Sequence, residues 1–100
     1  MASPLDNYLN EISKICSTHK VKQLYVFGSV LGDSFTSKSD IDFLVDFQNI
    51  DLDIYADNYF DLKFKLQHLL NRKIDLLEAQ AIKNPYFKSE IDRTKTLIYG

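Results

Sequence analysis

The sequence holds a single cysteine, Cys16, in 100 residues. One thiol excludes an internal disulfide and a cysteine-based zinc site, which fits a protein kept in a reducing compartment. Cys16 falls in an apolar stripe with helical spacing, so we expect it to pack in the core. These features favour a cytoplasmic protein.

Long apolar runs and an excess of charge are also missing. No stretch approaches the roughly 20 apolar residues of a membrane helix, and the N-terminus lacks the basic flank and apolar segment of a signal peptide. The net charge of −2 provides no basic field for a large nucleic-acid surface. We therefore expect neither a membrane nor an extensive nucleic-acid partner, whereas small phosphorylated ligands remain possible.

The chain is short and alternates between helical and extended patterns. One hundred residues predict a single domain over 1–100. This alternation predicts an α/β (α+β) fold with a small mixed three- to four-stranded sheet packed against helices. The patterns predict a first helix over about 4–19 and strands at 24–27, 40–47 and 73–77. An aspartate-rich loop within 48–62 leads into a second helix, which is expected to end near residue 71. A C-terminal helix that includes Ile98 is expected after Pro85. The residues from 20 to 23 are expected to form a polar connection.

Three aspartates stand inside or beside the expected strands. Because side chains alternate along a strand, Asp40 and Asp42 share one face. Asp75 lies inside another apolar run and can join them if the two strands are neighbours. Like charges at such spacing repel unless a cation lies between them, and Mg²⁺ prefers carboxylate and phosphate oxygens. Two such ions stabilise both oxygens of an in-line displacement at phosphorus, so the three acids predict nucleotidyl transfer.

A Gly28-Ser29 turn follows the first expected strand. A glycine at a strand end lets the backbone approach a ligand closely, and free N–H groups after it can bind an anion. The segment lacks the Gly-Lys-Ser/Thr ending of a P-loop, so ordinary ATPase chemistry is not indicated. We expect Gly28 and Ser29 to hold the phosphates of a nucleoside triphosphate.

The order of these motifs resembles the DNA polymerase β-type nucleotidyltransferase superfamily. Gly28-Ser29, then Ser39-Asp40-Ile41-Asp42, and then Asp75 in Lys73-Ile74-Asp75-Leu76-Leu77 carry the resemblance, which covers nearly the whole chain. The short length is similar to the minimal, MNT-type members. The resemblance implies that Asp40 and Asp42 bind two Mg²⁺ ions, that Asp75 binds the catalytic ion and helps to deprotonate the acceptor hydroxyl, and that ATP is the substrate.

Many minimal members resemble antitoxins that pair with a HEPN-type helical toxin and transfer AMP to it. The resemblance therefore implies a protein acceptor and a toxin partner. One departure is that Asp33 stands where the family often has a second glycine, with Gly32 one residue earlier. The alternative function is a binding protein that is weak or inactive in catalysis and neutralises its partner by covering it.

Other polar and aromatic residues have simpler interpretations. We expect His19 and His68 to have structural or surface roles, and Lys38 to be solvated. Tyr55, Tyr59 and Phe60 are expected in the core or at its rim, with stacking of one of them on a nucleobase as the alternative.

Overall fold

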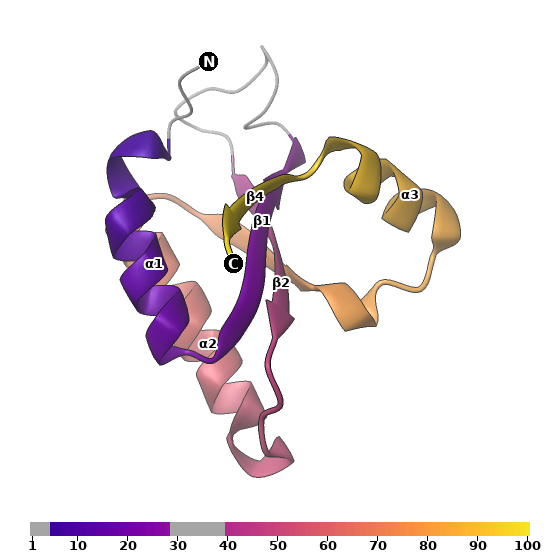
Figure 1. Ribbon diagram of the computed structural model, residues 1–100. Helices are drawn as coiled ribbons and strands as arrows, with labels where there is room; N and C mark the ends of the chain where they lie inside the picture. Colours follow the sequence, from indigo (N-terminus) through magenta and orange to yellow (C-terminus); the bar gives the residue numbers. More distant parts are fainter. Residues whose placement is uncertain (1–4, 29–39) are drawn as a thin grey trace.

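The computed structural model describes residues 5–28 and 40–100 (Figure 1). The elements in chain order are η1 (Asp6–Tyr8), α1 (Leu9–Thr18), β1 (Val21–Phe27), β2 (Ile41–Phe47), α2 (Leu52–Leu70), β3 (Ile74–Glu78), η3 (Ala79–Ala81), α3 (Pro85–Thr94) and β4 (Thr96–Tyr99). This arrangement confirms the expected α/β class.

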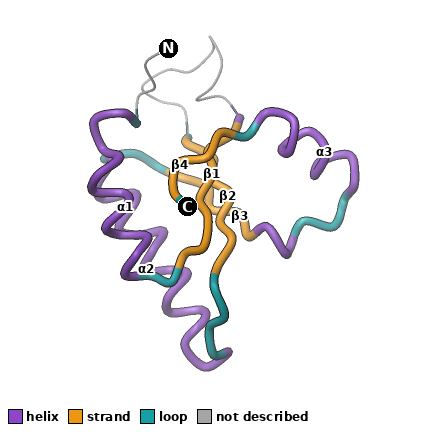
Figure 2. The backbone as a smooth tube through the Cα atoms, viewed as in Figure 1, coloured by secondary structure: helices purple, strands orange, loops and turns teal. Residues whose placement is uncertain are grey.

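The four strands form one mixed sheet in the order β3-β2-β1-β4 (Figure 2). β1 runs antiparallel to both β2 and β4, whereas β2 and β3 are parallel. The parallel connection is made by α2, as a crossover between parallel strands requires. β2 is therefore a central strand with β3 as its neighbour, which is the arrangement that the three-carboxylate hypothesis needs.

Alternation along β2 divides its side chains between two layers. Ile41, Phe43, Val45 and Phe47 belong to the core that α1 and α2 cover, and Phe43 is fully buried there. Leu44 points to the other face, where it packs with Phe27 and with Ile91 of α3. Figure 1 shows α1 and α2 on one side of the sheet and α3 on the other. Asp42 has the parity of Leu44, so it lies on the α3 side.

The first strand is longer than the sequence pattern predicts. β1 begins at Val21, so the expected polar connection over 20–23 is wrong for residues 21–23. Val21 is buried and pairs with Phe47, while Lys20 makes the turn after α1 with a φ of 57°. Tertiary pairing with β2 thus outweighs the low strand preference of Lys22 and Gln23.

The C-terminal prediction is wrong beyond Thr94. α3 ends there, and residues 96–99 form β4 along the free edge of β1 instead of continuing the helix. The β-branched residues Thr94, Thr96 and Ile98 lower the helix preference, and β1 offers unpaired backbone groups at that edge. Ile98 packs against the core from this strand.

The remaining boundaries differ by smaller amounts. α2 begins at Leu52, so most of the expected aspartate-rich loop is helical. The first predicted helix is an η1 turn followed by α1, and its predicted start at residue 4 lies outside the described residues. No helix among the described residues is long and apolar enough to cross a membrane.

Two of the simpler expectations are confirmed. Cys16 is fully buried, and this burial raises the pKa of its thiol to about 12. His19 is buried between α1 and α2, where its Nε2 lies 2.5 Å from Oδ2 of Asp61. His68 is exposed and stacks on Phe64. Both histidines therefore have structural or surface positions, and Lys38 lies outside the described residues.

Candidate active site

The parallel pairing of β2 with β3 places Asp42 directly opposite Asp75. Both aspartates follow isoleucines that are buried on the α1/α2 face, Ile41 and Ile74. The buried isoleucines limit the register, because a slip of β3 by one residue would turn Asp75 into the core and Ile74 out of it. Two acids from separate strands thus meet on the α3 side of the sheet, as the sequence predicts.

Burial and the neighbouring acids together raise the pKa of Asp42. Burial raises the pKa of Asp42 from 3.8 to about 6, with further contributions from the charge of Asp75, from a hydrogen bond with the Asp75 side chain and from the charge of Asp40. In the protonated form, Asp42 donates a hydrogen to the carboxylate of Asp75. The fold therefore holds two carboxylates close together, and a divalent cation bound between them would reduce their repulsion.

Gly28 lies against this pair at the end of β1. Its φ is +79°, a conformation that favours glycine, and Phe27 beside it pairs with Asp42. A Cβ at position 28 would overlap Oδ2 of Asp42. The absence of a side chain therefore leaves the carboxylate oxygen accessible, so that a ligand can approach both Asp42 and the backbone after β1.

Of the other predicted site residues, Asp40 is described by the structure and Ser29 is not. Asp40 directly precedes β2 and contributes charge to the Asp42 environment. Within residues 5–28 and 40–100, no three His, Cys, Asp or Glu side chains are arranged to hold a metal ion by themselves. Ser29 and Asp33 lie outside the described residues. The structure thus brings Asp42, Asp75 and Gly28 together, with Asp40 within electrostatic reach.

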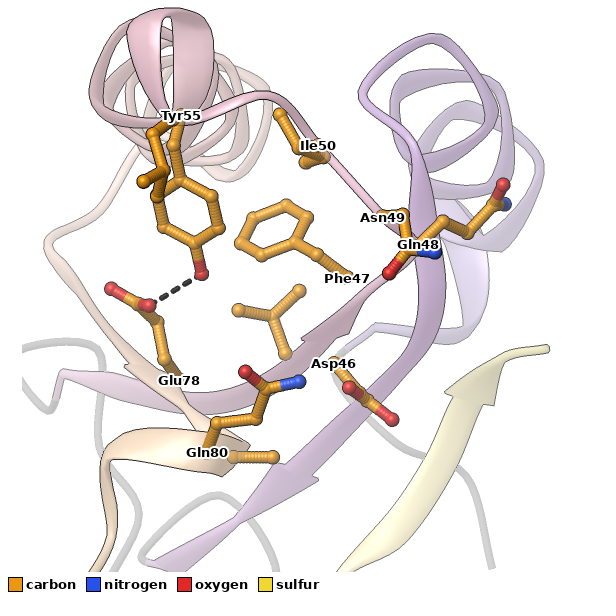
Figure 3. Close-up of a pocket in the computed structure, with 11 residues that line it drawn as sticks. Asp46, Phe47, Gln48, Asn49, Ile50, Tyr55, Glu78 and Gln80 are labelled. Atoms are coloured by element: carbon orange, nitrogen blue, oxygen red, sulfur yellow. Dashed lines mark hydrogen bonds between the residues drawn. The ribbon is translucent and has the colours of Figure 1, made fainter.

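A hollow that sequence reasoning missed lies at the ends of β2 and β3 that are far from Asp42 and Asp75 (Figure 3). It has a volume of about 190 Å³, and its walls include Asp46, Gln80 and a hydrogen bond from Tyr55 to Glu78. Asp46 is four residues beyond Asp42 on the same strand, which corresponds to about 13 Å. The sequence feature that could have indicated this hollow is a second acid at the far end of each strand, Asp46 in β2 and Glu78 in β3. This hollow is separate from the paired aspartates.

The fold and the site define a small α/β protein with paired strand carboxylates that are suited to metal and phosphate ligands. Comparison with known families makes this class more specific. Residues 10–100 match the family described as Polymerase beta, Nucleotidyltransferase, and the chain belongs to this nucleotidyltransferase family.

Individual relatives agree with this membership. The chain is 40% identical over 98 residues to the MJ0128 protein of Methanocaldococcus jannaschii, whose name gives protein adenylyltransferase as a provisional activity; the match covers 97% of this chain and 95% of that protein. It is 30% identical over 89 residues to the protein adenylyltransferase MntA of Thermococcus cleftensis, covering 81% of this chain and 87% of that protein.

Solved structures have the same fold. One provisionally described as a minimal nucleotidyltransferase has a TM-score of 0.77 at 24% identity and covers 92% of this chain and 90% of its own. A toxin-antitoxin complex with AMP-PNP has a TM-score of 0.72 at 22% identity and covers 93% of this chain and 73% of its own. The predicted class and fold are both confirmed.

Proposed function

We propose that the protein transfers AMP from ATP to a hydroxyl group of a partner protein, by chemistry that uses two Mg²⁺ ions. The observation that carries this proposal is the Asp42–Asp75 pair on adjacent parallel strands, facing the open side of Gly28. Family membership and protein adenylyltransferase relatives support the reaction class.

The donor set at the site fits Mg²⁺. Carboxylate oxygens are hard ligands, and Asp42 and Asp75 are already held together at a cost in charge repulsion. Asp40, Asp42 and Asp75 would hold the ions, which supply positive charge to the phosphate oxygens and to the leaving group. Gly28 and Ser29 would bind the phosphates through their backbone N–H groups.

The chain's own residues would position and deprotonate the acceptor. The acceptor oxygen bonds to the α-phosphorus, the bond from that phosphorus to the bridging oxygen breaks, and pyrophosphate leaves. Asp75 is exposed at the edge strand of the sheet, so an incoming hydroxyl can reach it. We assign to Asp75 the uptake of the hydroxyl proton.

The proposed acceptor is a HEPN-type helical toxin, for which the protein would act as antitoxin. A structural neighbour shows a tri-AMPylated HEPN toxin of Shewanella oneidensis in complex with an MNT antitoxin, with a TM-score of 0.62 at 22% identity. The buried thiol of Cys16 fits the reducing cytoplasm as the site of this reaction.

The test is transfer of label from α-³²P-ATP to a purified HEPN-type toxin protein. We expect Mg²⁺-dependent labelling of the toxin by the wild-type protein and loss of at least 100-fold in Asp42→Asn. Asp46→Asn, on the same strand and face, is the matched control and should keep its rate. Tight toxin binding without labelling would support the alternative, in which the protein neutralises its partner by complex formation alone.

A further inference from the structure

Helix α2 has apolar side chains on two opposite sides. Leu62, Leu66 and Leu70 are buried against the sheet. On the outward side, Phe60 and Phe64 are 63% and 64% exposed and lie one turn apart. A helix that is apolar on both sides is normally covered on both sides, so the outward side is suited to a partner.

The outward side also has an ordered charge pattern. We define the outer seam of α2 as six exposed residues that the 3.6-residue period places on one side of the helix: Asp53, Asp57, Phe60, Phe64, His68 and Asn71. Its first part is acidic, its middle is aromatic, and its last part has no acid. The acidic end of one copy can therefore lie beside the acid-free end of another without repulsion between like charges.

A groove continues the seam at its C-terminal end. It is open, has a volume of about 500 Å³ and is lined by Phe64, Gln67, His68, Asn71, Arg72 and Lys73. These residues include no carboxylate, and the exposed Lys73 adds a positive charge to the groove. An apolar and acidic helix segment is the chemistry that fits it, and the first half of the outer seam is such a segment.

We propose that a second copy of this chain docks on the outer seam, with the two α2 helices antiparallel about a two-fold axis between Phe60 and Phe64. Each Phe60 then contacts the Phe64 of the other copy, and each Asp57 faces the other copy's His68. A two-fold axis makes both contacts occur twice. A parallel pair would instead place acids against acids, so the charges select the antiparallel arrangement.

This interface leaves the candidate active site open. α2 covers one face of the sheet (Figure 1). The Asp42–Asp75 pair lies on the other face. Self-association is thus compatible with nucleotide transfer and does not depend on it. A single helix pair buries less surface than a standard stable interface, so we expect a dimer of micromolar affinity.

The first test is sedimentation velocity of the full chain over a concentration series from about 1 to 500 μM, a range chosen to span micromolar affinity. We expect a shift from monomer to dimer in the wild type and a monomer throughout in Phe64→Glu. Phe87→Glu, which changes an exposed ring on α3, is the matched control and should still form the dimer. A wild-type monomer at 500 μM, or a dimer that Phe64→Glu leaves unchanged, would overturn the proposal.

Cysteine cross-linking tests the orientation. Native Cys16 is buried, so added surface cysteines control the reaction. The double variant Asp57→Cys/His68→Cys should form a covalent dimer on mild oxidation. Each single variant should not, because the two copies of one position lie about 16 Å apart in the antiparallel pair. Efficient cross-linking of either single variant would refute the antiparallel arrangement.

Discussion

Replacing Asp42 with asparagine should stabilise the protein when divalent cations are removed. The pKa of Asp42 is raised from 3.8 to about 6, first by burial and then by Asp75 and Asp40. Such a rise corresponds to at most about 3 kcal/mol at neutral pH. Because the carboxyl is partly exposed, solvent screening reduces the expected effect to about 1 to 2 kcal/mol.

The raised pKa of Asp42 determines how the stability of the protein changes with pH. The folded state binds the proton on Asp42 more tightly than the unfolded state, so the wild type carries no penalty below about pH 4 and the full penalty above about pH 6. The stability of the wild type should fall as the pH rises through this window. The Asp42→Asn variant should lack this fall, since its amide carries no charge and can donate to Asp75.

The assay is thermal unfolding in EDTA at pH values from 4 to 8. A change of 1 to 2 kcal/mol predicts a midpoint for Asp42→Asn about 5 to 10 °C above the wild type at pH 8, with the two proteins alike at pH 4. Asp46→Asn is the matched control, because it removes an acid from the same strand and face but not from the pair. Equal midpoints at pH 8, or a wild-type stability that does not fall with pH, would refute the reasoning.

Three further changes test the turn after β1, the buried histidine between α1 and α2, and the cap of α3. Gly28→Ala should cost about 1 to 2 kcal/mol in urea unfolding, because φ is +79° and the new Cβ meets Asp42; unchanged stability would contradict the assigned turn. His19→Gln should cost about 2 kcal/mol, because the buried ring joins the Ile15 carbonyl to Asp61, whereas exposed His68→Gln should cost almost nothing. Asn84→Ala should cost about 1 kcal/mol through loss of the α3 cap, and Asn84→Ser should keep most of it.

The elements near the candidate active site could be predicted because local patterns define them. The alternation of Ile41, Asp42 and Phe43 fixes which face each side chain takes, and the structure confirms that Asp75 is on the neighbouring strand. The direct opposition of Asp42 and Asp75 could not be derived, because register depends on how α2 returns the chain to β3.

The prediction failed where pairing with another strand decides the structure. Residues 21–23 are expected from the sequence to be a polar connection but belong to β1 and pair with β2, and Ile98 is expected to be helical but lies in β4, which pairs with β1. The expectation that Phe60 lies in the core or at its rim is wrong for a different reason, since this side chain is exposed on the outer seam of α2. The residues of the seam share a helix with the buried leucines, and only the exposures of Phe60 and Phe64 separate the two sides.

The most direct test of the central claim is calorimetric titration of the protein with AMP-PNP, with and without Mg²⁺. We predict binding that requires Mg²⁺, a loss of at least 10-fold in affinity in both Asp42→Asn and Asp75→Asn, and no change in Asp46→Asn. Binding of equal strength in Asp42→Asn, Asp75→Asn and the wild type would show that these carboxylates do not hold the metal and the nucleotide.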